Sequence, residues 1–211
     1  MQRPLRCCQA SELMPAPSVT APYDGMRPGP PSAPNDHVPV RDTSELLLRP
    51  ATAGDALCLS VLAMQVFLDT YATEGIRPAI AREVLAAYSE QSFLNALSSA
   101  GTHIELAELH GHLIGFAQVT LAAAHALAPE GKQAELLRLY VQEPFTGANV
   151  GTRLLAKAEQ IAAEWGASVL WLTPWVHNHR ALAFYARRGY TDFGLTHFTF
   201  EGESHANRVL V

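Results

Sequence analysis

The spacing of the apolar residues changes near Gly101, and this change limits the folds open to the chain. Before it, apolar side chains between Leu57 and Leu68 recur every three or four residues, which is the period of an α-helix. After it, apolar residues between Ile104 and Leu121 flank His110-Gly111, a pattern typical of a β-hairpin. Helices followed by strands predict a mixed α/β fold.

The other apolar runs extend these two patterns. We expect a strand at 45–49, a helix from Ala53, further helices from Pro78 and over 92–97, a strand at 134–141, a helix at 151–165, a strand at 168–172, a helix at 178–188 and a strand at 190–200. This order predicts one domain, residues 45–211, built around one sheet.

Residues 1–44 differ in composition from the rest. Prolines recur from Pro15 to Pro39 among Gly, Ser and Ala, and the segment has little periodic apolar surface to offset the entropy of ordering it. We expect a flexible or polyproline-like arm. Met14 and Met26 are alternative starts that would leave the folded region intact.

The composition narrows the partners and the compartment. A formal net charge of −5 argues against a nucleic-acid partner and mildly favours cationic substrates. Cys7, Cys8 and Cys58 have neither metal-ligand spacing nor a pairing pattern, which favours a reducing interior. No apolar run approaches the ~20 residues of a membrane helix. We therefore expect a cytoplasmic protein without a membrane partner.

An anion site is predicted where the strand ending at Val141 breaks at Pro144 and passes through Gly147 and Gly151 into a helix. The first N–H groups of a helix have no internal partner and lie at the positive end of its dipole, so they bind phosphates. Neither the dinucleotide fingerprint nor the Walker motif is present. The alternative is an ordinary glycine-containing loop.

Two blocks carry a family resemblance. Leu139-Tyr-Val141 precedes Thr146-Gly-Ala-Asn-Val-Gly151, and Asn178-His-Arg-Ala-Leu-Ala-Phe-Tyr-Ala-Arg-Arg-Gly-Tyr190 follows the next strand. Together they resemble the GCN5-related N-acetyltransferase (GNAT) family, with its signatures Gln/Arg-x-x-Gly-x-Gly/Ala and Asn-x-x-Ala-x-x-Phe-Tyr-x-x-x-Gly-Phe/Tyr. The second block is nearly complete. In the first, Thr146 replaces Gln or Arg, and Asn149 replaces a glycine but tolerates a left-handed backbone.

The resemblance implies a single mixed, mostly antiparallel, twisted sheet flanked by helices, and acetyl transfer from acetyl-CoA to a primary amine. Coenzyme A would lie between the splayed strands 134–141 and 168–172. The residues expected to contact it are Leu139, Tyr140, Val141, Thr146, Gly147, Ala148, Asn149, Val150, Gly151, Thr152, Asn178 and Tyr185.

The reaction needs a proton for the departing thiolate and a base for the amine. Tyr185 is the candidate acid, although a buried core tyrosine would fit the same helix. Glu135 is expected on the same strand face as Leu137, Leu139 and Val141, and is a candidate base. Bulk water is the alternative. The weaker candidates are Glu105, Glu108 and His177.

The acceptor side is predicted at the end of the first helix. Phe67, Thr70 and Tyr71 are similar to the acceptor wall of family members that act on polyamines and other small amines, and Tyr88 and Phe93 are further candidates. Acetylation of a protein N-terminus or lysine, and a non-catalytic CoA-binding module, are the rival functions. A homodimer stays open. His177 and His179 have no third ligand nearby in sequence, so no metal is expected.

Overall fold

The computed structural model describes residues 45–200 and 203–211. The predicted N-terminal arm, with Cys7 and Cys8, lies outside the described residues, and Cys58 is an exposed free thiol.

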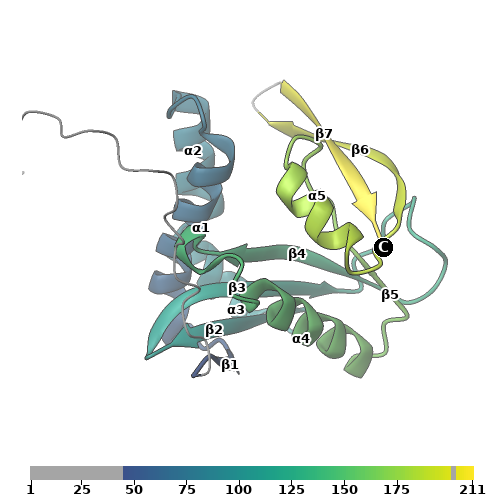
Figure 1. Ribbon diagram of the computed structural model, residues 1–211, viewed down its shortest axis with the longest axis horizontal. Coiled ribbons are helices and arrows are strands. Elements are labelled where there is room, and N and C mark those ends of the chain that lie inside the picture. Colours follow the sequence, from purple (N-terminus) through teal and green to yellow (C-terminus); the bar gives the residue numbers. More distant parts are fainter. Residues whose placement is uncertain (1–44, 201–202) are drawn as a thin grey trace, which may run out of the picture. The chain divides into compact units, whose positions relative to one another are not determined.

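The main sheet has five strands in the order β1-β2-β3-β4-β5 (Figure 1). They are β1 (Leu47–Pro50), β2 (Thr102–Leu109), β3 (His112–Leu121), β4 (Gln133–Val141) and β5 (Val169–Trp171). All neighbours pair antiparallel except β4 and β5, which are parallel. The predicted mixed, mostly antiparallel sheet flanked by helices is confirmed.

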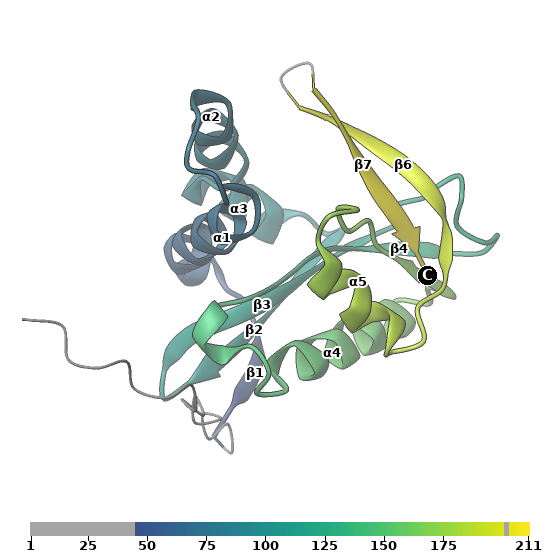
Figure 2. The ribbon, with the colours of Figure 1, turned by 45° about the horizontal axis from the view of Figure 1, so that its top comes forward.

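Helices cover the two faces of this sheet (Figure 2). One face carries α1 (Ala56–Tyr71), which follows a short 3-10 turn at Ala53–Asp55, and α2 (Pro78–Ala87) and α3 (Glu90–Ser98). The other carries α4 (Val150–Glu164), and α5 (His179–Ala186) follows β5. Pro78 begins α2 at the position where a helix needs no N–H, and the Ser89 hydroxyl caps α3.

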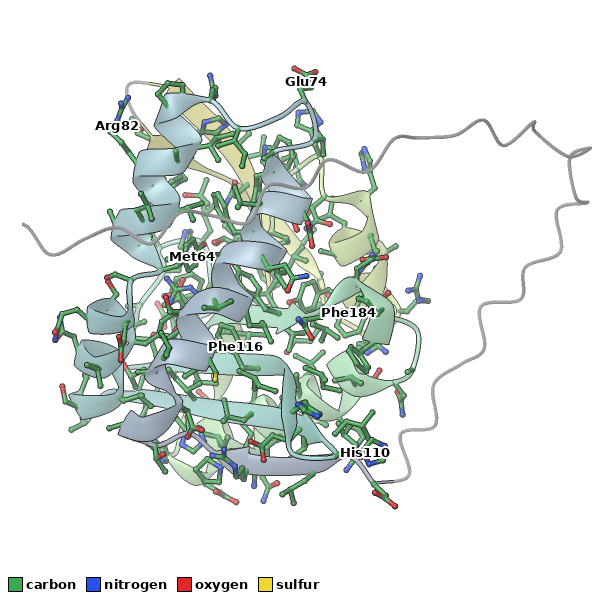
Figure 3. The ribbon with its side chains drawn as sticks, turned by 90° about the vertical axis from the view of Figure 1, so that its left-hand side faces the viewer. Met64, Glu74, Arg82, His110, Phe116 and Phe184 are labelled. Atoms are coloured by element: carbon green, nitrogen blue, oxygen red, sulfur yellow. The ribbon has the colours of Figure 1, made fainter. Side chains whose placement is uncertain are left out.

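Each face buries its own core. Under α1 and α3 the core includes Leu59, Leu62, Phe93, Leu106 and Phe116, and under α4 it includes Ala107, Val119, Leu154, Leu155 and Ala158. Figure 3 looks onto α1, with Met64 on the helix and Phe116 on the strand behind it.

The stretch Ala53–Tyr71 is long and apolar enough to cross a membrane by length and composition alone, which differs from the sequence-based expectation. Its inner face, however, packs on the sheet through Ala56, Leu59, Leu62 and Ala63. The same helix also carries the large apolar side chains Leu57 and Val61 in exposed positions.

A β-bulge in β4 corrects one expectation about the site. Gln118 lies opposite Arg138 and Val119 opposite Leu136, so Leu137 is the extra residue of β4. The bulge moves Leu139 and Val141 onto the α4 face with Leu136, whereas Glu135 shares the α1 face with Tyr140. The prediction that Glu135 lies on the same face as Leu139 and Val141 is therefore wrong.

The chain ends in a hairpin of β6 (Asp192–Phe200) and β7 (Glu203–Leu210), which forms a second ladder. Isolated bridges join it to the segment after β5: Leu172 pairs with Leu210, and Trp175 pairs with Asn207. Strand β7 was not predicted, because most of its residues are polar and, among its described side chains, those of Val209 and Leu210 at its end are the buried ones.

The strands β4 and β5 separate after a short pairing. Their ladder runs from Gln133–Val169 to Glu135–Trp171, while β4 continues to Val141. The predicted splay between these strands is present, and it leaves one edge of the second half of β4 open.

Candidate functional site

A groove of about 890 Å³ lies along this open edge. It is bounded by the end of α1, the second half of β4, the loop into α4, and α5 with the segment before it. The predicted site residues that line it are Thr70, Tyr71, Leu139, Tyr140, Val141, Thr146, Gly147, Asn149, Gly151, Thr152, Asn178 and Tyr185. The lining does not include Phe67, Glu135, Ala148 or Val150.

The backbone of β4 presents polar groups to the groove. The Gln142 N–H donates to the Ile114 carbonyl at 2.9 Å, so alternate residues of β4 direct their backbone groups toward β3. The N–H and C=O groups of Leu139 and Val141 therefore point to the open edge. Gly115 permits the close approach of β3, because a Cβ there would lie 2.7 Å from the Tyr140 carbonyl oxygen.

The loop into α4 has the backbone geometry expected for the predicted anion site. Gly147 has φ +79°, and Asn149, at φ 65°, is the left-handed residue directly before the helix. The first amides of α4, at residues 150–152, lie at the positive end of the helix dipole. The Thr146 hydroxyl donates to the Glu143 carbonyl at 2.8 Å, so it turns back into the loop.

Tyr185 lies on α5 and lines the groove. Its side chain is buried, and burial raises its pKa, an effect that the nearby Arg188 cation opposes. The phenol is therefore protonated at neutral pH and can donate its proton. The helix is positioned by Asn178, whose Oδ1 accepts the Ala181 N–H at 3.0 Å and caps the first turn.

Aromatic rings form the α1 end of the groove. The Tyr71 and Trp175 rings lie 5.4 Å apart, from α1 and from the segment before α5. Phe67 packs behind them at 4.6 Å from the Tyr71 ring, so it supports the wall without lining the groove. Burial raises the pKa of Tyr71 to about 12. Trp175 was missed because its loop carries no periodic pattern.

The candidate bases lie in different places. Glu135 is half-buried outside the groove, where desolvation raises its pKa and the Arg138 cation opposes the rise. Glu105 is buried and accepts a hydrogen bond from His103 at 2.9 Å, in the tautomer that protonates Nε2. Glu108 pairs with Arg49 at 2.6 Å. His177 alone among these four side chains lines the groove.

The other two predicted acceptor residues lie in the core beside Tyr140. The Tyr88 and Tyr140 hydroxyls are 3.0 Å apart, and the Arg138 guanidinium lies 5.0 Å from the centre of the Tyr88 ring. Phe93 is fully buried against Phe116. Neither Tyr88 nor Phe93 lines the groove.

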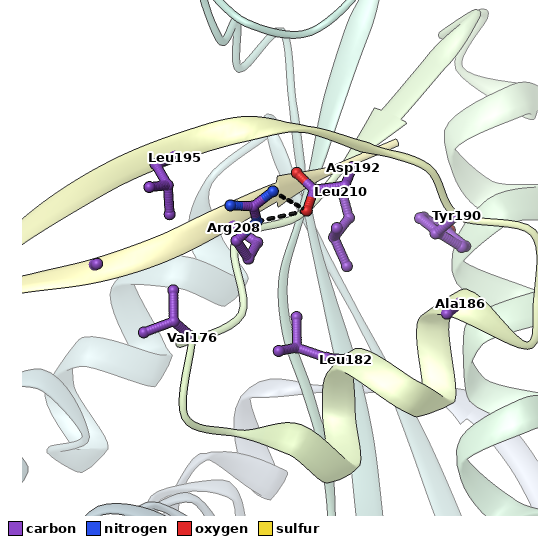
Figure 4. A pocket seen from close by; sticks show the side chains of 9 residues that line it. Val176, Leu182, Ala186, Tyr190, Asp192, Leu195, Arg208 and Leu210 are labelled. Atoms are coloured by element: carbon purple, nitrogen blue, oxygen red, sulfur yellow. Dashed lines mark hydrogen bonds and ion pairs between the residues drawn. The ribbon is translucent and has the colours of Figure 1, made fainter.

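A second cavity, of about 590 Å³, lies between α5 and the β6–β7 hairpin (Figure 4). Val176 and Leu182 point into it, and Asp192 and Arg208 form an ion pair at its edge. Its lining is otherwise mostly apolar, and Tyr190 is its one further residue with an ionisable side chain. Across residues 45–200 and 203–211, no group of three His, Cys, Asp or Glu side chains could hold a metal ion.

Comparisons with known proteins agree with this geometry. The model of the GNAT acetyltransferase family matches residues 68–190. An uncharacterised N-acetyltransferase of Lactobacillus delbrueckii is 26% identical over 132 residues, which cover 63% of this chain and 76% of that protein. An IAA acetyltransferase of Azospirillum brasilense is 30% identical over 101 residues, covering 48% and 62%.

Solved structures share the fold. The PaiA N-acetyltransferase of Thermoplasma acidophilum, in complex with coenzyme A, aligns with a TM-score of 0.60 and 24% identity over 77% of this chain and 97% of that one. A GCN5-related N-acetyltransferase of Rhodopseudomonas palustris aligns with a TM-score of 0.58 and 27% identity over 78% and 92%.

The family model spans more than half of the chain and covers nearly all the residues that line the groove. The chain therefore belongs to the GNAT acetyltransferase family, and it is an N-acyltransferase that uses acetyl-CoA.

Proposed function

We propose that this chain transfers the acetyl group of acetyl-CoA directly to the primary amine of a small molecule in the groove between α1 and α5. The observation that carries the proposal is that Tyr185, the open edge of β4 and the first turn of α4 line one groove. The amine nitrogen attacks the thioester carbonyl, the C–S bond breaks, and the Tyr185 hydroxyl gives its proton to the departing sulfur.

Backbone groups supply the rest of the binding. The outward N–H groups of Leu139 and Val141 suit the developing negative charge on the carbonyl oxygen, because fixed donors need no reorganisation during the reaction. The amides of 150–152 suit the diphosphate. Neither role needs a particular side chain, so the altered signature residues are compatible with both.

The acceptor side supports a small amine. The Tyr71–Trp175 ring contact narrows the α1 end, where an extended polypeptide would have to pass. Aromatic faces attract ammonium groups, and Asp69 lines the same end with a carboxylate. The cations Arg180 and Arg188 line the groove from α5 and the turn after it.

We propose that water takes the amine proton. Glu135 lies outside the groove lining and on the opposite face from Leu139 and Val141. The groove contains exposed residues, including Asp69 and His177, so solvent reaches the amine.

The test is a thiol-release assay with acetyl-CoA and a panel of acceptors. The panel holds polyamines, aminoglycosides, amino-acid amides, and peptides with a free N-terminus or lysine. We expect kcat/KM at least about tenfold higher for a small amine than for any peptide, a difference of about 1.4 kcal/mol in transition-state binding. Preference for a peptide would contradict the acceptor class, and CoA binding without turnover of any acceptor would indicate a non-catalytic module.

A further inference from the structure

A guanidinium reaches the N-terminus of α4 from another element. Arg188, in the turn after α5, places its charged group 3.6 Å from the centre of the Phe184 ring, and one of its terminal nitrogens contacts the Thr152 hydroxyl. Its other terminal nitrogen donates to the Phe184 carbonyl at 3.0 Å. The Phe184 ring in turn packs on the α4 backbone, since a Cβ on Gly151 would lie 3.5 Å from it.

The N-terminus of α4 repels this cation, whereas the C-terminal end of α5 attracts it through the Phe184 carbonyl. A helix N-terminus carries about half a positive charge, and a cation beside the first turn is repelled by it. Among the described residues no carboxylate forms an ion pair with Arg188, whereas Arg180, also from α5, is paired with Glu143 at 2.6 Å. The first turn of α4 and the Arg188 guanidinium therefore line one groove, and both are suited to a negative ligand there.

Arg188 also has unused donors. Of its five N–H groups, the Nε group is buried and has no hydrogen-bond partner within the described part of the chain. The stacking on Phe184 fixes the plane of the guanidinium, and a fixed fork is suited to phosphate oxygens. The loop itself supplies no such group, because the Thr146 hydroxyl is bonded to the Glu143 carbonyl.

We propose that Arg188 is the side-chain ligand of the acetyl-CoA diphosphate, acting with the amides at the start of α4. The family signature usually has Gln or Arg, a long hydrogen-bond donor, at the position of Thr146. In this chain Arg188 would supply such a donor from the turn after α5. The proposal rests on the use of acetyl-CoA, not on the identity of the acceptor.

Calorimetry with CoA and with 3′-dephospho-CoA tests the assignment. The substitution Arg188→Gln removes the charge but keeps an amide donor, and we expect the dissociation constants of both ligands to rise by about tenfold or more, and by the same factor. The control is Lys157→Gln, which also removes a positive charge but lies on α4 outside the groove lining. We expect it to change both dissociation constants by less than twofold. If Arg188→Gln lowers the affinity for CoA but not for 3′-dephospho-CoA, Arg188 binds the 3′-phosphate and the proposal is wrong. If neither affinity falls, Arg188 does not bind the cofactor.

A folding effect is separated by a second variant. Should Arg188→Gln melt below the assay temperature, Arg188→Lys, which keeps the charge but loses the fork, is expected to weaken both ligands at least threefold, and a smaller change contradicts the proposal. A wild-type chain that binds CoA but acetylates no small amine would overturn the acceptor proposal and leave this one standing. A wild-type chain that does not bind CoA would overturn both.

Discussion

Asn149 keeps the turn before α4 in a left-handed conformation without a glycine. Its φ of 65° is one that asparagine tolerates better than other residues with a Cβ. The substitution at this signature position therefore preserves the backbone that presents the α4 amides. At Thr146 the side chain is turned into the loop, and the nearby cation comes from Arg188. The two departures from the family signature have different physical consequences.

Glu135 provides the first prediction. Because it lies outside the groove lining, Glu135→Gln should change kcat by less than about threefold, well below the 10²–10⁴ expected for loss of a general base. A loss of that larger size in thiol release would restore Glu135 as the base.

The same substitution predicts a pH effect on stability. Desolvation raises the pKa of Glu135 in the folded protein, so between the unfolded and folded pKa values the folded state binds the proton more tightly. The contribution of Glu135 to stability is therefore present below the unfolded pKa and is lost as the pH rises through the folded pKa. Glu135→Gln should raise the melting temperature relative to wild type more at pH 7 than at pH 4. Equal differences at both pH values would contradict this.

Trp175 should affect the acceptor rather than the donor. Its ring contacts Tyr71 at the α1 end of the groove. We expect Trp175→Ala to raise the KM of the best small amine by about tenfold, as loss of an aromatic contact to an ammonium would, while the affinity for CoA stays within twofold. Initial rates at saturating acetyl-CoA and calorimetry with CoA check the two halves. A change in CoA affinity alone would place Trp175 on the donor side.

Strand β4 is the element on which the groove depends. Its first residues pair with β5, its bulge at Leu137 changes the face of the residues that follow, and its second half presents the open edge. Gly115 holds β3 close to that half. Gly115→Ala would put a methyl group 2.7 Å from the Tyr140 carbonyl oxygen, so one of the two strands must shift.

We expect this overpacking to lower the free energy of unfolding by about 1–3 kcal/mol and to weaken CoA binding as well. The matched control is Gly101→Ala, where the nearest atom would be the Ser99 hydroxyl at an ordinary 3.8 Å. Urea unfolding of both variants measures the difference. If the two variants are equally stable, an added methyl group at Gly115 does not force β3 and β4 apart, and the prediction is wrong.

The elements were predictable where local signals were strong. The hairpin at His110-Gly111, the helix start at Pro78 and the Asn178 block all follow from turn chemistry, capping or spacing. The bulge at Leu137 leaves no such signal, because an extra residue changes the pairing of a strand but not its composition. The sequence therefore could not predict which face of the sheet Glu135 occupies, since that face depends on the bulge. Trp175 contacts Tyr71 on α1, and Arg188 contacts Thr152 on α4. Both contacts join segments distant in sequence, which the spacing of apolar residues cannot reveal.

At the scale of the molecule, the sheet joins two unlike halves. Helices α1–α3 cover one face and bring aromatic rings to the groove, while α4 and α5 bring a helix N-terminus, arginines and Tyr185. In the proposed function, the acceptor and donor sides are thus built by different parts of the chain and meet at the open edge of β4. Tyr185 lies in the groove that both sides share, so catalysis should depend on it more than binding does.

The most direct test of this account compares Tyr185→Phe with wild type in thiol release and in CoA binding. The account predicts that kcat falls by about 10²-fold or more, because the phenol acts when the sulfur departs, while the dissociation constant of CoA stays within about twofold. Unchanged turnover in a folded Tyr185→Phe variant would contradict it.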